Sequence, residues 1–274
     1  MKKYLRVMCL VILVGAVMGL GGCSKSEEAA NTPPAKTNLK MATNANFQPV
    51  VDAMIPLMKA KGYTIELLTF DDPLSINVAT QEGSVDVNFY QHLPYLNKFN
   101  SSKNGTLVMV QLYLLVSKMG LFSNKHKSTD ALPEGATIAI AMDAANKDRG
   151  LRMLRDNGFL TLAETPASGA YTLVDIIDNP KKFKFVEVDL YQLLRTLDDV
   201  DAGAINASYL IAAGKDLSSG ICFSKDDDTF PCGVVVREDN KDTQWIKDLM
   251  ECITSDECRN VAKEYYKGSF RILF

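Results

Sequence analysis

The hydrophobic positions after residue 38 alternate between short runs typical of strands and longer stretches with helical spacing. Val50, Met54, Leu57 and Met58 recur at helical spacing up to Gly62, where this first helix is predicted to stop. Three strands and a second helix are predicted in the same part of the chain, namely strands at residues 39–43, 63–70 and 85–90 and a helix at residues 72–82.

Residues 107–118 form an apolar run that is longer than a typical strand, and they are predicted to cross between two parts of the fold. A second series of elements begins after residues 128–130. Its predicted strands are residues 136–141, 184–188, 201–205 and 233–237. Its predicted helices are residues 149–156, 172–177, 191–197 and two more that begin near residues 241 and 256, and residues 143–146 are predicted to be a polar turn.

Strands that alternate with helices along the whole chain favour an α/β fold with mainly parallel sheets and helices on both faces. Two such series, joined by extended apolar crossings near residues 112–120 and 230–237, predict two lobes with a cleft between them. The first predicted lobe combines residues 39–115 with residues 235–274, and the second covers residues 116–234.

The first 22 residues are predicted to be a secretion signal and not part of the fold. Three basic residues precede an uncharged apolar run at residues 7–20, which is too short for a comfortable membrane span. The small residues before Cys23 resemble a bacterial lipobox, at which the signal is cut and Cys23 becomes the lipid-modified first residue; the alternative is an ordinary signal peptide with an incidental cysteine. Residues 23–38 are polar and lack periodicity, which predicts a flexible tether.

The composition of the mature chain argues against several classes of protein. Removing the signal takes away three of the 30 basic residues and none of the 33 acidic ones, so the formal charge falls from −3 to −6. A nucleic-acid-binding protein would normally carry a clustered basic face, so no nucleic-acid partner is expected. No segment after Leu20 predicts a membrane span, and the motifs of metalloproteases, serine hydrolases and phosphate-binding loops are missing from the mature sequence.

Four cysteines follow Cys23, and export favours their pairing. Outside the cytoplasm an even number of cysteines invites disulfide formation, and their grouping favours Cys222–Cys232 and Cys252–Cys258 over the two crossed alternatives. Zinc binding is the competing interpretation, but no pair has the short spacing of zinc motifs and no histidine lies nearby. Paired cysteines would leave no thiol for nucleophilic catalysis.

Residues 85–96 contain the first candidate for a ligand site. Val85, Val87 and Phe89 alternate with polar residues as in a pleated strand, and residues 91–95 then open a turn or short helix. Ligands of open α/β sheets bind at the carboxyl ends of strands, because the loops there leave a crevice. From these residues alone, a ligand site and a packed aromatic corner are equally good interpretations.

The same segment resembles a family signature. Residues 86–96, DVNFYQHLPYL, are similar to the aromatic-Q-H-x-P-Y-L signature of the NlpA/MetQ family, the methionine-binding lipoproteins of ABC importers. Four further segments resemble family segments in the family's order, at residues 66–71, 175–181, 204–206 and 237–242. The resemblance implies a type 2 periplasmic-binding fold that closes over one amino acid and presents it to a permease.

Carried over to this chain, the resemblance implies a ligand site of five residues. Tyr90, His92 and Tyr95 would form the aromatic pocket for an apolar side chain, Arg149 would bind the carboxylate, and Asn206 would contact the polar backbone of the ligand. A thioether side chain clamped in this way gains roughly 0.3–1.5 kcal/mol from each contact between sulfur and ring. Neither a metal nor a cofactor is implied.

The place of Arg149 in the sequence supports this role on physical grounds. A cation in the first turn of a helix opposes the helix macrodipole, unless an anion is bound there by the guanidinium and the free N–H groups together. The alternative is a solvated arginine among Lys147, Arg152 and Arg155, and the residue pattern alone favours that alternative.

Two positions depart from the family pattern and bear on the ligand. Pro73 stands where the family usually has a pocket tyrosine, and Cys232 stands where it has a second ligand-binding asparagine. The loss of a ring would reshape the side-chain end of the pocket. The loss of an amide would remove a polar contact, and a buried polar group left without a partner costs about 1–3 kcal/mol.

The sequence thus predicts a lipid-anchored substrate-binding lipoprotein on the extracytoplasmic face of the cell membrane. It would bind methionine or a related small amino acid, its partners would be an ABC permease and its ATPase, and it would not be an enzyme. The alternatives are a receptor for another apolar amino acid or a short peptide, an exported enzyme on the same fold, and a surface lipoprotein that acts in adhesion.

Overall fold

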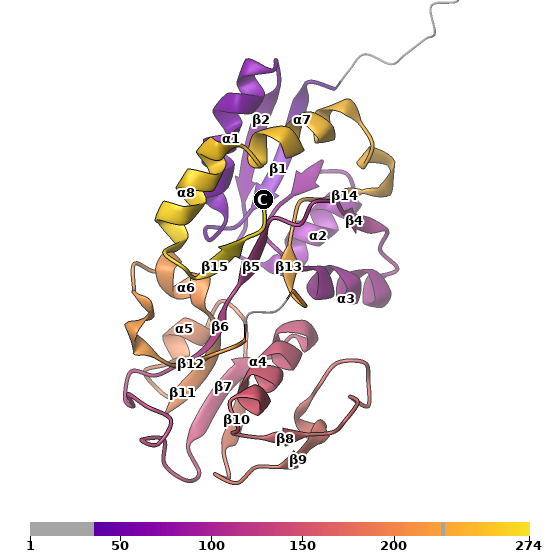
Figure 1. Ribbon diagram of the computed structural model, residues 1–274. Coiled ribbons are helices and arrows are strands. Elements are labelled where there is room, and N and C mark those ends of the chain that lie inside the picture. Colours follow the sequence, from indigo (N-terminus) through magenta and orange to yellow (C-terminus); the bar gives the residue numbers. More distant parts are fainter. Residues whose placement is uncertain (1–35, 226–227) are drawn as a thin grey trace, which may run out of the picture. The chain divides into compact units, whose positions relative to one another are not determined.

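The computed structural model describes residues 36–225 and 228–274, which contain two five-stranded sheets (Figure 1). The first sheet has the order β2-β1-β3-β14-β4. Its strands are β2 (Thr64–Thr69), β1 (Asn38–Thr43), β3 (Val87–Asn88), β14 (Val235–Arg237) and β4 (Leu107–Met109). β1 pairs in parallel with β2 and β3, whereas β14 pairs antiparallel with β3 and β4. Strands from the first part of the chain therefore share this sheet with β14, which follows the whole second sheet in the sequence.

The second sheet repeats this plan with residues from the middle of the chain, in the order β10-β7-β11-β6-β12. Its strands are β10 (Lys184–Val188), β7 (Thr137–Ala141), β11 (Ala202–Asn206), β6 (Met119–Phe122) and β12 (Gly220–Phe223). β7 pairs in parallel with β10 and β11, and β6 pairs antiparallel with β11 and β12. The predicted α/β fold is confirmed. Each sheet is mixed, since it contains two parallel and two antiparallel strand pairings.

Two smaller sheets complete the strands of the described region. β13 (Pro231–Cys232), β5 (Leu115–Ser117) and β15 (Phe270–Ile272) form one, and β8 (Thr161–Leu162) and β9 (Ile176–Asp178) form the other. The apolar run at residues 107–118 is therefore two short strands, β4 and β5, in different sheets. The helix predicted at residues 172–177 is wrong: one 3-10 turn, Leu173–Asp175, leads directly into β9, and the carboxylate of Asp175 accepts hydrogen bonds from the N–H groups of Ala167 and Thr172.

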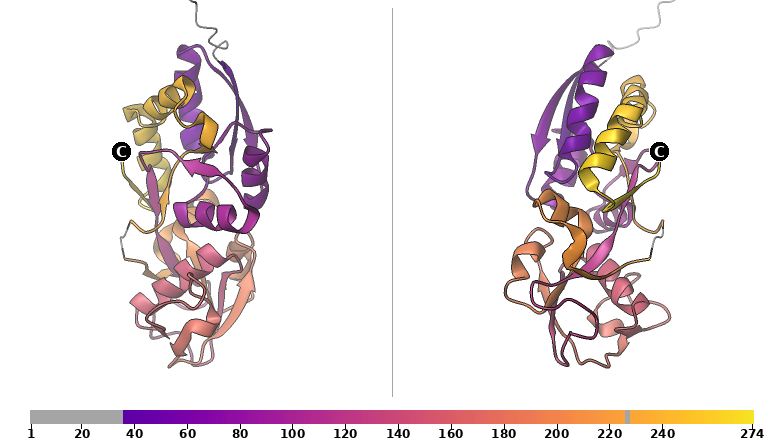
Figure 2. Two further views of the ribbon diagram at one scale, coloured as in Figure 1. Left: turned by 90° about the vertical axis from the view of Figure 1, so that its right-hand side faces the viewer. Right: turned by 60° about the vertical axis from the view of Figure 1, so that its left-hand side comes forward.

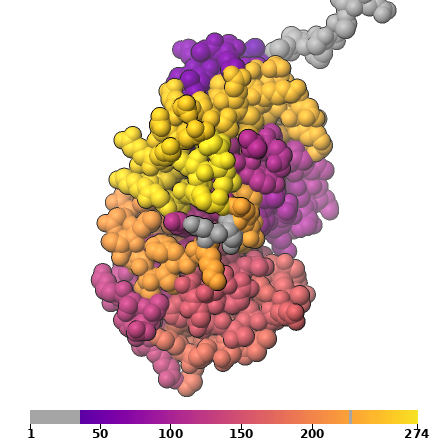
Figure 3. All heavy atoms as spheres, viewed as in Figure 1, coloured from indigo at the N-terminus to yellow at the C-terminus, as the bar shows by residue number. Residues whose placement is uncertain are grey.

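Helices cover both faces of the sheets, as predicted. The α-helices are α1 (Gln48–Ala60), α2 (Pro73–Gln81), α3 (Leu93–Lys103), α4 (Ala144–Asp156), α5 (Leu193–Thr196), α6 (Ala207–Ala212), α7 (Gln244–Ile253) and α8 (Asp256–Tyr266). Single 3-10 turns also occur at Leu217–Ser219 and Glu238–Asn240. α1 contacts β2 on one side and α7 and α8 on the other, so it lies between the first sheet and the C-terminal helices (Figure 2). In the space-filling view the yellow C-terminal helices lie in front, and the indigo atoms at the start of the described region are visible mainly above them (Figure 3).

In the second sheet, alternate residues of one strand belong to two different hydrophobic clusters. Ile138 and Ile140 of β7 belong to one hydrophobic cluster, with residues of α4, whereas Ala139 and Ala141 belong to a second cluster, with residues of α5 and α6. Successive side chains of a strand point to opposite faces, so a continuously apolar strand requires cover on both sides. Small alanines on one face let α5 approach the strand.

The N-terminal predictions lie mostly outside the described residues. The signal peptide, the lipidation site Cys23 and residues 23–35 of the predicted tether belong to this part, and β1 begins at Asn38, one residue before the predicted strand. Among the helices of residues 36–225 and 228–274, none is both long and apolar enough to cross a bilayer.

Candidate functional site

A cavity is lined largely by residues at or just after the ends of β1, β3, β7 and β11, together with residues of the three-stranded sheet β13-β5-β15. The first four strands belong to both five-stranded sheets, and the cavity lies where their carboxyl ends open into loops and helix starts. This is the position at which open α/β sheets bind ligands.

All seven candidate residues from the sequence line this one cavity. They are Pro73, Tyr90, His92, Tyr95, Arg149, Asn206 and Cys232. The fold thus brings together residues from α2, the turn after β3, α4, β11 and β13. Their roles toward a ligand stay predictions, but their proximity is a property of the structure.

Arg149 lies within α4 and not in its first turn, so the macrodipole argument was wrong. α4 begins at Ala144, with Asp143 as its N-cap, because the Asp143 carboxylate accepts the N–H of Asn146 at 2.9 Å. The guanidinium is 4% exposed, donates to Asn206 Oδ1 at 2.8 Å and to the carbonyl of Ser117, and lies 4.8 Å from the centre of the Phe230 ring. Arg149 is therefore buried at the cavity wall, with its guanidinium fixed by these contacts.

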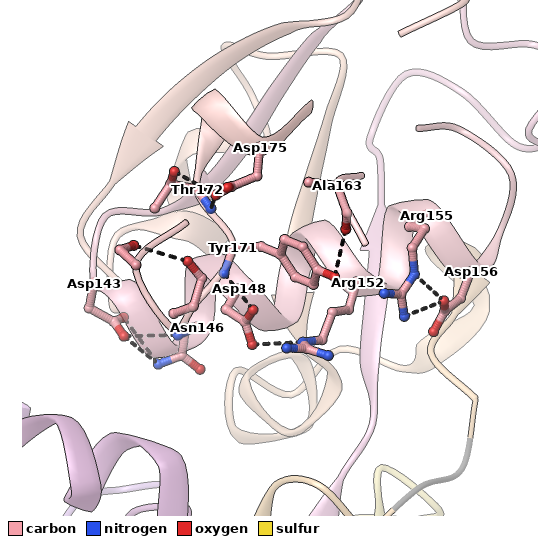
Figure 4. Close-up of polar contacts among 12 residues, drawn as sticks. Asp143, Asn146, Asp148, Arg152, Arg155, Asp156, Ala163, Tyr171, Thr172 and Asp175 are labelled. Atoms are coloured by element: carbon pink, nitrogen blue, oxygen red, sulfur yellow. Dashed lines mark hydrogen bonds and ion pairs between the residues drawn. The ribbon is translucent and has the colours of Figure 1, made fainter. Parts of the chain in front are cut away.

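Two other cations of α4, Arg152 and Arg155, pair with carboxylates of the same helix (Figure 4). Arg152 donates to the carboxylate of Asp148 at 2.8 Å, and Arg155 pairs with Asp156 at 2.7 Å. Lys147 forms an ion pair with Glu187 at 2.8 Å. None of these three cations lines the cavity, so the interpretation of Arg149 as one solvated arginine among several is wrong.

His92 is the N-cap of α3 and is neutral. Its Nδ1 accepts the N–H of Tyr95 at 3.1 Å, so the ring proton must be on Nε2, which donates to Asn146 Oδ1 at 3.1 Å. Burial, and secondly the positive charge of Arg149, lower the pKa of His92 to about 3. His92 therefore presents a fixed donor and no charge at neutral pH.

A row of amides connects His92 with Arg149. Asn146 Oδ1 accepts from His92 and from Asn206 Nδ2, the latter at 3.3 Å, while Asn146 Nδ2 donates to both carboxylate oxygens of Asp143 at 3.1 Å. Asn206 Oδ1 accepts from Arg149. Each amide is oriented by its neighbours, so Asn206 positions the guanidinium as well as facing the cavity.

Aromatic rings form much of the remaining wall. Tyr90 and Tyr95 meet edge to face with ring centres 6.3 Å apart, and the hydroxyl of Tyr90 donates to the carbonyl of Pro73 at 2.7 Å. Two further tyrosines that the sequence did not single out, Tyr191 and Tyr209, also line the cavity. Their rings meet edge to face with centres 5.7 Å apart. Burial raises the pKa of Tyr191 to about 12 and that of Tyr209 well above its usual value, so these rings stay neutral.

The structure contradicts both predicted disulfide bonds, since all four cysteines are free thiols. Cys222 packs with the core of the second sheet, its sulfur 3.9 Å from that of Met153, whereas Cys232 lies in the core of the first sheet and lines the cavity. The sulfur of Cys258 lies 3.9 Å from the carbonyl oxygen of Val50. Burial raises the pKa of Cys232 to about 12, so this side chain is an uncharged thiol.

Other cavity residues were missed because their signal in the sequence is short. Asn46 follows a buried strand, which is where ligand-contacting residues of α/β proteins are expected, but the loop after β1 carries no motif. Asn146 was interpreted only as part of a polar turn. Ser117 and Ser208 line the cavity from β5 and α6.

No group of three potential metal ligands from His, Cys, Asp and Glu occurs in the described parts of the chain. The cavity combines one guanidinium, oriented amides, hydroxyls and aromatic rings. This set of groups suits a small ligand with an anionic end and an apolar end.

Comparison with known proteins extends the resemblance to nearly the whole chain. The model of the NlpA lipoprotein family matches residues 39–272. The D-methionine-binding lipoprotein MetQ of Salmonella typhi is 32% identical over 263 residues, which cover 93% of this chain and 94% of the relative. Among solved structures, a nutrient binding protein from Burkholderia cenocepacia bound to methionine has a TM-score of 0.80 and 31% identity, over 86% of this chain and all of that one. The crystal structure of the methionine binding protein MetQ has a TM-score of 0.82 and 30% identity, over 87% and 99% of the two chains.

Proposed function

Because the chain belongs to the NlpA lipoprotein family, we propose that it is a substrate-binding lipoprotein of an ABC importer that binds methionine or a related small amino acid. The observation that carries the proposal is one cavity in which a buried guanidinium lies near aromatic walls. The names of its relatives, D-methionine-binding lipoprotein and a protein bound to methionine, support the choice of ligand.

In the proposed complex the two ends of the ligand meet different walls. Arg149 binds the carboxylate, since its fork of N–H donors matches a carboxylate geometrically, and Asn206 holds Arg149 and contacts the ligand backbone. Tyr90, His92 and Tyr95 surround the apolar side chain. No step changes the covalent structure of the ligand, since the neutral His92 is a hydrogen-bond donor and not a base at neutral pH.

The two five-stranded sheets are the proposed two lobes, made of residues 39–115 with 235–274 and of residues 116–234. Closure of these lobes around the ligand would remove it from water, and the closed form would deliver it to a membrane permease driven by an ATPase. A lipid on Cys23 would keep the protein at the extracytoplasmic face of the membrane, with the residues up to 38 as the tether.

A different ligand for the same receptor is the second candidate, and Pro73 and Cys232 favour it. Both line the cavity, and the resemblance places a tyrosine and an asparagine at these positions. A proline in place of a ring leaves more room around Tyr90, and a neutral thiol is a weaker hydrogen-bonding group than an amide. Another apolar amino acid would fit these changes.

Calorimetry on protein that has been unfolded, stripped of ligand and refolded tests the function. We expect saturable, one-to-one binding of one methionine enantiomer, with a negative heat-capacity change from burial of the apolar side chain. Failure of both enantiomers to bind at millimolar concentration would exclude methionine. The same titration with leucine, norleucine and a methionine dipeptide would then separate another amino acid from a short peptide.

A further inference from the structure

Asn46 is a buried residue of the cavity wall whose amide oxygen has no hydrogen-bond partner among the described residues. The residue is 4% exposed, and its Nδ2 donates to the hydroxyl of Ser208 at 3.0 Å. Nearly all buried polar atoms in folded proteins are paired, so an exception calls for an explanation. In a cavity wall, a donor on the bound ligand supplies one.

The loop around Asn46 holds this oxygen in place before any ligand arrives. The side-chain oxygen of Asn44 accepts the N–H groups of Asn46 and Phe47 at 3.1 and 3.3 Å, and the Asn44 amide donates to the hydroxyl of Tyr191 at 2.9 Å. These bonds fix the turn between β1 and α1. The acceptor is therefore preorganised, which lowers the entropic cost of binding.

A chain of contacts leads from Asn46 to the anion-binding group. The hydroxyl of Ser208, which accepts from Asn46, lies 3.4 Å from the hydroxyl of Ser117, and the carbonyl of Ser117 accepts from Arg149. Asn46 and Arg149 thus lie along one wall and are linked through two serines. An anionic and a cationic group on neighbouring atoms of a ligand can face such a wall together.

Among the side-chain amide oxygens that line the cavity, only that of Asn46 has no partner within the described residues. Among the described residues that line the cavity there is no carboxylate, so an ammonium group must be bound by neutral oxygens. Of the amide oxygens, that of Gln91 accepts from Asn77, that of Asn146 from His92 and Asn206, and that of Asn206 from Arg149. Asn46 carries the remaining one.

We propose that Asn46 Oδ1 accepts a hydrogen bond from the α-ammonium group of the bound amino acid, an inference that rests on the proposed amino-acid-binding function. α1 begins at Gln48, and its N-terminal dipole opposes a cation there by about 2- to 5-fold in affinity. A hydrogen bond to a charged group contributes about 10- to 100-fold, so it outweighs the dipole. Asn46 then selects amino acids over acids of the same shape that lack the amine.

The test compares two ligands on the same variant, so that a general loss of folding cannot imitate the result. The probes are methionine, as the enantiomer that binds the wild type more tightly, and 4-(methylthio)butanoate, which differs only in lacking the amine. Asn46→Ala should raise the Kd for methionine roughly 10- to 100-fold and that for the amine-free acid less than about 3-fold. Asn46→Asp should weaken the amine-free acid more than methionine, because its carboxylate repels one ligand and pairs with the ammonium of the other.

Ser208→Ala is the matched control, since it removes the partner of Asn46 Nδ2 and leaves Oδ1 in place. It should change the two Kd values by the same factor. Equal weakening of both ligands by Asn46→Ala would overturn the role of Asn46 and leave the amino-acid-binding function standing. If the wild type binds neither probe nor any other free amino acid, the function falls and this inference falls with it.

Discussion

Acidification is expected to destabilise this protein through His92. The imidazole is 6% exposed, its Nδ1 accepts the N–H of Tyr95, and its pKa is lowered from 6.5 to about 3 by burial and by the charge of Arg149. Protonation would place a donor at Nδ1 against the N–H of Tyr95 and a second positive charge in the cavity. His92 therefore binds a proton much more weakly in the folded state than in the unfolded chain.

The sign and size of the effect follow from linkage. Above pH 6.5 neither state binds the proton, and this contribution is absent. Between pH 6.5 and about 3 the unfolded chain is protonated and the folded chain is not, so the free energy of unfolding falls by about 1.4 kcal/mol for each pH unit. At about pH 5 the loss is about 2 kcal/mol, which is a large part of a typical stability of about 5–15 kcal/mol.

Urea unfolding at about pH 7.5 and pH 5 measures this loss directly. The wild type should lose about 2 kcal/mol more than His92→Gln between the two values, since carboxylates and other groups contribute alike to both proteins. The matched control is His126→Gln, which removes the only other histidine and retains His92, and it should keep the additional loss. If wild type and His92→Gln lost the same amount, the assignment of His92 as a buried neutral donor would be refuted.

Three further predictions concern binding, thiols and anchoring. Arg149→Met should weaken methionine binding by at least about 30-fold in calorimetry, because loss of one partner of a buried charge pair costs about 2–5 kcal/mol, whereas Arg152→Met, whose guanidinium pairs with Asp148 outside the cavity, should stay within about 3-fold. An equal effect of the two variants would contradict the role of Arg149. Protein denatured without reductant should take up alkylating reagent at Cys222, Cys232, Cys252 and Cys258, as mass spectrometry would show, and resistance of either predicted pair would restore the disulfide interpretation. Cys23→Ala should move the protein from the membrane fraction to the soluble extract, and unchanged fractionation would count against the lipid anchor.

Local pattern was enough to predict most elements of the fold. The strand and helix periods located β1, α1, β2, α2 and β7, and the strand predicted at residues 201–205 is β11, Ala202–Asn206. The start of α4 was placed too late, because residues 143–146 look like a turn when Asp143 is not recognised as the cap. The disulfide bonds were inferred from the number and grouping of cysteines, which carry no information on where each sulfur points.

The sequence by itself determined the α/β class and the family resemblance, and it predicted the candidate ligand-binding residues Tyr90, His92, Tyr95, Arg149 and Asn206. Tertiary structure alone decided that β3 pairs with β14, that Arg149 is buried against Ser117, and that Asn46 faces the same cavity. Periodicity records which face of a segment is buried, because that depends on the segment itself. It cannot record which distant segment supplies the partner, because hydrogen bonds across a cavity are made by residues that meet only when the chain has folded.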